Sequence, residues 1–216
     1  MSWIDNIKDI KKDKGYSQNG EEAIIAYIFE NIKPYKKYFV DFGAGDGFWL
    51  SNTRALEENG WDGLWMDGNN LGNDEVMEEH ITAENINDLF KKYKVPQSFG
   101  LLSIDIDGND YWVWEAITYD PAVVVIEMNG CIKEGISKTI VYNPDHTWQH
   151  NDYYGASFEA LKKLGHAKGY KLIYQHQAVN MFFVKTDLLP SFDDSVISYE
   201  HNQYHRKAHH GNWINV

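Results

Sequence analysis

Four apolar runs punctuate the first 130 residues and predict buried strands. They occur in "KKYFVDF", "WDGLWMDGNN", "FGLLSIDI" and "PAVVVIEM". A strand covered on one face alternates strictly between apolar and polar residues, and these runs do not. We therefore expect strands that are buried on both faces, as in the parallel sheets of α/β proteins.

Segments with apolar residues at helical spacing lie between these runs. Residues 20–33 predict a first helix, with Asn19 as its cap and Glu22 three positions later. Further helices are expected in "LSNTRALEENG" and "ENINDLFKKY", near 109–118, and in "SFEALKKLGHAKG". A short acidic helix near 73–79 and a brief strand in "HITA" complete the alternation.

The second half of the chain adds a long irregular segment and a strand pair. Residues 129–154 are rich in aromatic and histidine side chains. This segment is longer than a simple connecting loop, so we expect it to form a functional lid. The stretch "YKLIYQHQAVNMFFVKTDLL" predicts two strands joined so tightly that they must be antiparallel neighbours.

These elements predict one domain over residues 1–216. Residues 1–35 form a helical cap, 36–188 the core with its lid, and 189–216 a polar tail. The tail carries four histidines at near-helical spacing: His201, His205, His209 and His210. Such a pattern can bind a metal ion. We expect instead that this part of the tail is disordered or contacts another subunit.

Composition narrows the classes of partner. With 20 basic and 32 acidic residues the net charge is -12, which argues against nucleic acid and against an anionic membrane surface. The single cysteine, Cys131, cannot form an internal disulfide, and nowhere do 18 apolar residues run together. We expect a soluble cytoplasmic protein that takes a small-molecule or glycan substrate and makes no integral membrane contact, with a homo-oligomer left open.

A glycine-rich turn, "DFGAGDG", follows the first strand and precedes a helix, where glycines let the backbone approach a ligand closely. Asp67 ends the next strand, 26 residues after Asp41, where nucleotide-binding folds place an acid on the ribose hydroxyls. Nicotinamide dinucleotides and S-adenosylmethionine both fit this arrangement. Asp41 and Asp46 in the turn would repel a pyrophosphate and attract a sulfonium, so methyl transfer fits better.

The closing antiparallel hairpin points the same way, and several stretches carry a family resemblance. "YSQNGEEAII", "YFVDFGAGDGFWLSNTRALEENGW", "LLSIDIDGNDYWVWEAI", "VVVIEMN" and "YYGASFEALKKLGHAKGYKLI" with "VNMFFVK" resemble the FkbM-like branch of class I S-adenosylmethionine-dependent methyltransferases. The resemblance implies an α/β, Rossmann-like fold: a seven-stranded, mostly parallel sheet with a terminal antiparallel hairpin and helices on both faces. It also implies methylation of a hydroxyl, commonly on a sugar in bacterial polysaccharide biosynthesis.

The resemblance assigns cofactor contacts to particular residues. It places the turn against the methionine part of S-adenosylmethionine, Asp67 on the ribose, and Asn85 at the helix that borders the adenine. Ser17 and Gln18 match an amino-terminal Ser-Gln that covers the cofactor. The turn residues concerned are Asp41, Gly43, Ala44 and Gly45, and Asp105 is a further contact. The stretch "MDGNN" departs from the acid and proline common in relatives, which puts the ribose contacts in doubt.

Acidic residues gather where two neighbouring strands end. If the strand persists, its period of two places Asp105 and Asp107 on one side, and Glu127 and Asn129 end the next strand. Crowded carboxylates persist only with a shared proton or a cation, and oxygen ligands favour magnesium, manganese or calcium. We predict a Mg²⁺ or Mn²⁺ site of Asp105, Asp107, Glu127 and Asn129. Asp110 is expected only to start a helix.

Proton removal from the acceptor hydroxyl needs a base or a metal. Asp105, Asp107, His146 and His150 are the candidate catalytic residues. The alternative is that the carboxylates contact the cofactor, cap a helix or pair with a lysine, and that the histidines are solvated. Aromatic residues of the lid could stack on a sugar or simply pack: Trp148, Tyr153 and Tyr154.

The leading function is therefore O-methylation of a sugar hydroxyl on a saccharide or nucleotide-linked sugar. N-methylation of an amino or amide group on a similar substrate is the second enzymatic interpretation. A non-catalytic module that binds the cofactor is the alternative outside enzymes.

Overall fold

The computed structural model describes residues 2–13, 15–189, 191–200 and 211–216. Its centre is a seven-stranded sheet in the order β3-β2-β1-β4-β5-β8-β7. The strands are β1 Tyr38–Phe42, β2 Asp62–Asp67, β3 Val76–Glu78, β4 Ser98–Ile104, β5 Asp120–Glu127, β7 Tyr170–His176 and β8 Asn180–Lys185. Only β8 runs against its neighbours, pairing antiparallel with both β5 and β7. The fold class is therefore confirmed: a Rossmann-like, mostly parallel sheet with a terminal antiparallel hairpin.

Both faces of the sheet are buried, which explains why the apolar runs do not alternate. Successive residues of a strand point to opposite faces. In β1, Val40 belongs to the core on one face and Phe39 to the core on the other, and both are fully buried. In β4, Leu102 packs in the same core as Val40, and Leu101 packs in the same core as Phe39. Each face is then covered by helices.

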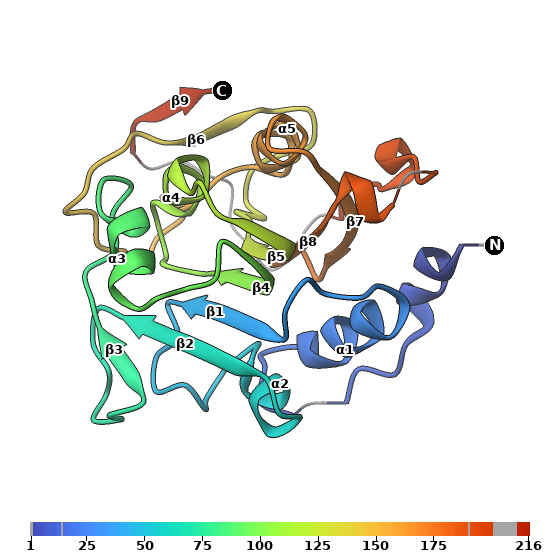
Figure 1. Ribbon diagram of the computed structural model, residues 1–216. Coiled ribbons are helices and arrows are strands. Elements are labelled where there is room, and N and C mark those ends of the chain that lie inside the picture. Colours follow the sequence, from blue (N-terminus) through green and yellow to red (C-terminus); the bar gives the residue numbers. More distant parts are fainter. Residues whose placement is uncertain (1, 14, 190, 201–210) are drawn as a thin grey trace.

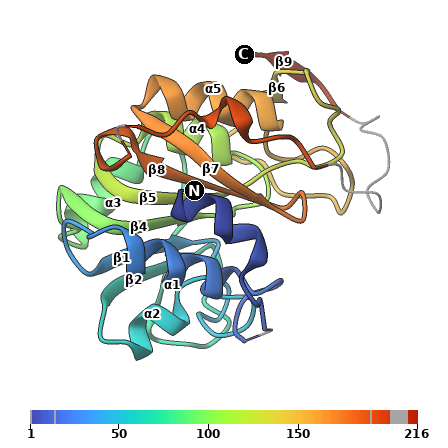
Figure 2. The same cartoon turned by 90° about the vertical axis from the view of Figure 1, so that its right-hand side faces the viewer.

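The helices lie in two layers (Figures 1 and 2). One face packs against α3 Ile86–Lys92, α4 Asp110–Ala116 and α5 Phe158–Ala167. The other packs against α1 Glu21–Asn31, α2 Arg54–Glu58 and the 3₁₀ helix Trp3–Asp9. Across the described ranges, no helix has the length and apolar character needed to cross a membrane.

The amino-terminal cap is helical as expected, and α1 begins one residue from the predicted start, but the predicted capping residues are wrong. Gly20, in the left-handed conformation at φ +85°, is the N-cap, and Asn19 and Glu22 make no capping box. The buried carboxylate of Glu21 instead accepts from the backbone N–H of Asn19 at 2.7 Å and from Nδ2 of Asn180 at 3.1 Å. Glu21 thus ties the turn before α1 to β8, and no side chain of the described residues caps the helix.

The edge of the sheet also differs from the prediction. A strand, β3, occupies the region of the predicted acidic helix near 73–79, and "HITA" forms no strand. The side chains of Asn69, Asn70 and Asn73 each accept from a backbone N–H two residues ahead. Such side-chain turns compete with helix formation. Val76 is buried and pairs in register with Trp65 of β2, which favours a strand here.

The lid and the tail are joined, which the sequence did not indicate. Within residues 129–154, β6 Lys138–Ile140 pairs antiparallel with β9 Trp213–Asn215. This small sheet is seen at the top of Figure 1. Residues 213–215 of the polar tail therefore form a strand that the sequence pattern did not predict. The tail histidines His201, His205, His209 and His210 lie outside the described residues.

Candidate active site

The carboxyl ends of β1 and β2 lie at the left of the sheet in Figure 1, and a crevice lies beyond the ends of these strands. β1 and β4 are neighbours although the chain winds from β1 to β2 first, and ligands bind at such a switch point. A cavity of about 250 Å³ lies there. Its walls come from the ends of β1, β2 and β4, from the segment after β3 and from the lid: Gly43, Asp67, Gly68, Glu79, His80, Ile81, Asp105, Ile106, Asp107, Asn109, Pro144, His146 and Thr147.

The glycine-rich turn packs directly on the end of β4. Gly43 has φ +76°, and a Cβ there would lie 1.4 Å from the backbone oxygen of Asp105. The N–H groups of Gly43 and Ala44 both donate to the carbonyl of Met66, at 3.1 and 3.2 Å. Only glycine permits this approach, so the first glycine of the motif sets the distance between two walls of the cavity.

Asp67 lies at the position expected for a ribose acid and already has two hydrogen bonds. Its Oδ2 accepts from the N–H of Gly45 and its Oδ1 from that of Asn69, both at 2.8 Å. A carboxylate offers about four acceptor positions, so each oxygen retains one for a hydroxyl. The carboxylate therefore connects the turn to β2 and still faces the cavity.

Asp41 does not line the cavity. It is 4% exposed, and its Oδ2 accepts from the Thr53 hydroxyl at 2.7 Å, which in turn accepts from Nε1 of Trp65 at 2.8 Å. Burial raises the pKa of Asp41 to about 6, and the hydroxyls of Thr53 and Ser103 oppose that rise. Asp41 thus supports the turn from beneath, and a direct contact with a ligand gains no support.

A buried cation that the sequence analysis missed also holds the turn. Arg54 is 4% exposed, and its Nε donates to the carbonyl of Gly47 at 2.9 Å. Its guanidinium lies 3.7 Å from the ring centre of Phe48 and 4.3 Å from that of Trp65. It also pairs with Glu75 at 3.2 Å, before β3. The only signal in the sequence was a lone arginine at the start of a helix in an acidic chain.

Three other predicted cofactor residues lie outside the cavity wall. Ser17 is buried, accepts from the N–H of Gly20 at 3.0 Å and bonds to Glu22, while Gln18 is exposed. Asn85 starts α3, and its amide bonds to the backbone of Thr82 and His80 at 2.9 and 2.7 Å. These contacts organise the surrounding turns, and the cofactor roles of the three residues stay predictions.

Three carboxyl groups converge as predicted, although β4 ends at Ile104 and the period-two argument does not apply. Carboxylate oxygens of Asp105, Asp107 and Glu127 all lie within 4.8 Å of one another. Asp107 has φ +54°, so a left-handed turn and not an extended strand directs it to the cluster. Asp110 opens α4 and accepts from the N–H groups of Ile106 and Gly108 at 2.8 and 2.9 Å, which stabilises that turn.

The cluster is electrostatically crowded. Burial, then the negative charges of Asp110 and Asp107, raise the pKa of Asp105 well above its usual range. Burial, then the charge of Asp105, do the same to the pKa of Glu127, and the two carboxyls share a hydrogen bond. The Oε2 atom of Glu127 is buried without a hydrogen-bond partner among the described residues. The site therefore favours a proton or a cation.

Asn129 follows this cluster in the chain but serves the lid. Its Nδ2 donates to the carbonyls of Asp152 and Tyr154 at 3.0 and 2.8 Å, and its Oδ1 accepts from the N–H of Cys131 at 2.9 Å. Both ends of the amide are therefore engaged, and its predicted role as a metal ligand gains no support.

Of the two lid histidines, His146 lies in the cavity wall. Its ring packs on Gly108, where a Cβ would lie 2.3 Å from Cδ2, and its Nε2 is buried without a partner in the described chain. Burial lowers the pKa of His146, and the nearby backbone and carboxylate of Asp107 oppose this. His150 is exposed and lies against Trp148, with ring centres 4.7 Å apart.

The predicted stacking rings have different surroundings. Trp148 is 37% exposed, and its Nε1 donates to the carbonyl of Asn151 at 2.7 Å. Tyr154 is only 6% exposed and its ring centre lies 6.1 Å from that of Trp148. Tyr153 points to β9, where its hydroxyl donates to the carbonyl of Asn212 at 2.6 Å. Of the three, Trp148 presents the most surface to a ligand.

The lid is attached to both sides of the crevice. Nε2 of His80 donates to the carbonyl of Pro144 at 2.8 Å, and the N–H of Ala83 donates to the Tyr142 hydroxyl at 3.2 Å. On the other side, Nδ2 of Asn109 donates to the carbonyl of Asn143 at 2.8 Å. His80 and its neighbour Glu79 were missed as wall residues because the edge strand was placed too late in the chain.

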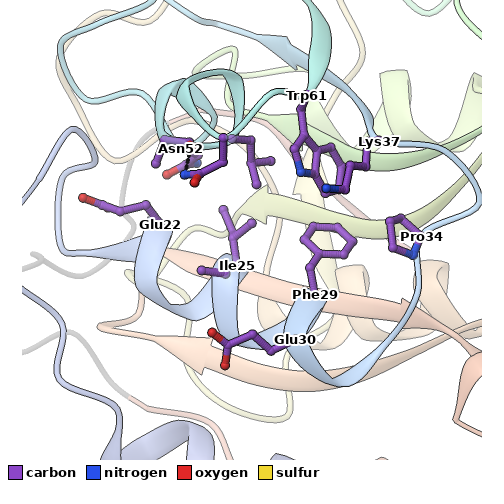
Figure 3. Close-up of a pocket in the computed structure, with 12 residues that line it drawn as sticks. Glu22, Ile25, Phe29, Glu30, Pro34, Lys37, Asn52 and Trp61 are labelled. Atoms are coloured by element: carbon purple, nitrogen blue, oxygen red, sulfur yellow. Dashed lines mark hydrogen bonds between the residues drawn. The ribbon is translucent and has the colours of Figure 1, made fainter.

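A second groove, of about 290 Å³, lies between α1 and α2 (Figure 3). It is slightly larger than the crevice but its floor is mainly apolar, with Phe29 against Trp61 at 4.6 Å between ring centres. Glu22, Glu30 and Lys37 lie around it without forming a cluster. The convergent polar groups of a reaction site are in the crevice, so we place the chemistry there.

No protein-family model matches the sequence, and no curated protein matches it significantly. Among solved structures, the N-terminal domain of EvdMO1 with SAH bound is 11% identical, with a TM-score of 0.47 over 84% of each chain. The same domain in the presence of SAH and D-fucose is 9% identical, with a TM-score of 0.46 over 84% of this chain and 94% of that one. The CMeT domain of the citrinin polyketide synthase is 12% identical, with a TM-score of 0.37 over 79% and 54%.

Similarities of this size do not transfer a function. The resemblance to the FkbM-like branch stays a prediction, and the assignment below depends on the residues of the crevice.

Gly43→Ala should destabilise the protein strongly because the new Cβ meets the backbone of Asp105, which cannot swing aside. We expect a loss of about 3 kcal/mol or more in the free energy of unfolding, measured by denaturant titration. Gly45→Ala is the matched control, since nothing lies within 4 Å of its Cβ position. It should cost only the left-handed backbone term, about 1–2 kcal/mol. Equal costs would contradict the close approach.

Asp41→Asn should flatten the dependence of stability on pH. A carboxyl whose pKa rises to about 6 on folding stabilises the folded state at low pH, and this contribution disappears as pH rises through 6. From pH 4.5 to 7.5 the wild type should lose about 2 kcal/mol that the variant does not lose. Unfolding titrations across that range measure it, and the other acidic groups largely cancel in the difference. Parallel curves would show that Asp41 titrates normally.

Proposed function

We propose that this protein is an S-adenosylmethionine-dependent O-methyltransferase that acts on a sugar hydroxyl of a saccharide or nucleotide-linked sugar. One observation carries the proposal. A single cavity brings together the glycine-rich turn at Gly43, the strand-end acid Asp67, the carboxyls of Asp105 and Asp107, and the imidazole of His146, whose Nε2 has no hydrogen-bond partner among the described residues. Cofactor-binding and proton-accepting groups thus lie in one place.

The proposed cofactor site follows the strand ends. Gly43 and its neighbours would lie against the methionine part, and the remaining acceptor positions of Asp67 would take the ribose hydroxyls. Glu79, His80 and Ile81 extend the same wall toward β3, in the direction of the adenine. The negative charge of the crevice favours a cationic sulfonium over a pyrophosphate.

The proposed base is His146. When bound, the cofactor supplies an electrophilic methyl group, and the attacking hydroxyl must lose its proton as the new bond forms. Because burial lowers the pKa of His146, the ring is neutral near neutral pH and can accept that proton at Nε2. The lid and Gly108 hold the ring in place.

The carboxyl cluster fits a divalent metal. It offers only oxygen atoms, it is crowded by repulsion, and Oε2 of Glu127 has no hydrogen-bond partner within the residues that the structure describes. Asp105, Asp107 and Glu127 would hold Mg²⁺ or Mn²⁺, which lowers the pKa of a bound hydroxyl. Without an ion, one proton shared by Asp105 and Glu127 relieves the same repulsion.

The biological setting follows from the resemblance in the sequence. A sugar acceptor, as in the FkbM-like branch, implies a role in surface-polysaccharide biosynthesis in the cytoplasm of a bacterium. Trp148, whose indole is exposed and held by a hydrogen bond to Asn151, supports an acceptor with a ring that can stack.

Calorimetry with S-adenosylhomocysteine tests the cofactor site. Asp67→Asn removes the charge from the proposed ribose contacts, so we expect about tenfold weaker binding or more. Asp62→Asn, at the exposed start of the same strand, is the matched control and should bind normally. If the wild type does not bind, or if both variants bind equally well, the proposed site is wrong.

Incubation with cofactor and bacterial glycan extracts, followed by mass spectrometry, then tests the reaction. A methyl group that survives alkaline hydrolysis is an ether, as proposed, whereas a labile methylated amide would support N-methylation. Binding without turnover would support the non-catalytic module.

Calorimetry with Mg²⁺, Mn²⁺ and Ca²⁺ in the presence of S-adenosylhomocysteine tests the metal. We expect binding that Glu127→Gln abolishes and that Asp88→Asn, at an exposed site on α3, leaves intact. Since the pKa values of Asp105 and Glu127 are raised, protons compete with the ion and binding should weaken as pH falls. The absence of binding to all three ions would leave the shared proton as the explanation of the cluster.

A further inference from the structure

The lid residue Tyr153 connects the crevice to a distant part of the chain. On one side its ring meets that of His146 edge to face, with centres 5.8 Å apart. On the other side it meets the ring of Trp213 at 5.1 Å. Its hydroxyl donates to the carbonyl of Asn212 at 2.6 Å and accepts from the N–H of Val141 at 3.2 Å. The ring is therefore fixed at both its edges and its polar end.

Gly211 completes the enclosure. A Cβ at this position would lie 2.1 Å from the Tyr153 ring, and the residue has a left-handed backbone with φ +76°. Both the steric contact and the backbone conformation therefore disfavour any residue other than glycine. Nζ of Lys138 lies 4.3 Å from the Trp213 ring centre and covers the outer side of β9. Residues 211–213 therefore pack on one side of the Tyr153 ring, and His146 packs on the other.

The strand β6 of the lid is also attached to parts of the protein other than β9. The carbonyl of Ile140 accepts from Nε1 of Trp112 at 2.9 Å, and Thr139 forms a bridge with Ala156. The N–H of Ser157 donates to the carbonyl of Lys138 at 2.9 Å. β6 is thus attached to α4 and to the start of α5, whereas β9 is the outer strand and Ile214 is 41% exposed. The contacts made by β9 act on the position of Tyr153 more than on the core.

We propose that Tyr153 is a positioning residue for His146, and that the segment Gly211–Trp213 holds Tyr153 in place. The segment contributes no reacting group. It fixes the imidazole against Gly108, where Nε2 is buried with no hydrogen-bond partner in the described part of the chain. The inference depends on the proposed function for its meaning, since His146 is the base only in that reaction.

The test uses the free protein and needs no acceptor or cofactor, so it can fail or succeed independently of the methyltransferase assignment. The variants are Gly211→Ala, Trp213→Ala and Trp213→Phe. Tyr153→Phe removes the hydroxyl contacts alone. Tyr35→Phe is the matched control, because its hydroxyl also joins distant segments, bonding to Asp187 at 3.1 Å far from the lid.

Two readouts separate positioning from general stability. The first is the ring C–H signal of His146 in a carbon–proton NMR spectrum, assigned with His146→Asn. The second is hydrogen exchange of the amides in residues 141–154. Loss of the edge contact and the hydrogen bond should speed that exchange by about tenfold. The exchange of the core strands should stay unchanged.

We expect Gly211→Ala and Trp213→Ala to shift or broaden the His146 signal and to speed exchange of the lid. Trp213→Phe should restore both because it retains an aromatic edge, and Tyr35→Phe should change neither. A His146 signal that stays at its wild-type position in both alanine variants would overturn the proposal. So would faster exchange throughout the molecule, because the segment would then stabilise the fold as a whole.

Discussion

The close approach of Gly43 to the backbone of Asp105 is the contact on which the crevice depends. β1 and β4 lie side by side where the winding of the sheet reverses, so their connections diverge and leave an opening at their carboxyl ends. With no side chain at Gly43, the turn after β1 lies on the end of β4. Asp67 then holds the turn from β2 through the N–H of Gly45, and Arg54 holds it from α2 through the carbonyl of Gly47. The backbone of the turn is thereby fixed before any ligand arrives.

A second constraint is the repulsion among the carboxyls beyond β4 and β5. Asp105 and Glu127 are forced together by adjacent strands, and Asp107 joins them because a left-handed residue turns the chain back. Folding tolerates such crowding when a proton or a cation neutralises part of the charge. Asp110, by contrast, has its charge stabilised by two backbone N–H groups and holds the turn in shape. The same stretch of sequence therefore contains acids with structural roles and acids with a free oxygen.

The lid shows how a segment without a strong pattern can still be ordered. Its anchors come from several directions: His80 after β3, Asn109 before α4, and Asn129 after β5. β9 adds the last anchor, from a part of the chain that reads as a polar tail. Each consists of a few hydrogen bonds or ring contacts between residues far apart in sequence. None of these contacts has a periodic signature that a sequence could display.

The sequence by itself determined the parts that depend on local periodicity. The apolar runs predicted four of the parallel strands, and the hairpin after α5 predicted the reversed strand β8, because burial on both faces and a tight turn both leave a readable pattern. The glycine turn, Asp67 and the acidic strand ends were likewise readable, since their positions follow from where the strands stop.

Tertiary structure alone decided which side chains face the cavity. It turned Asp41 beneath the glycine turn, Asn129 into the lid and Tyr153 toward β9, and it joined Glu21 of α1 to Asn180 of β8. The physical reason is that these side chains take their directions from partners that lie far away along the chain and become neighbours only in the folded protein.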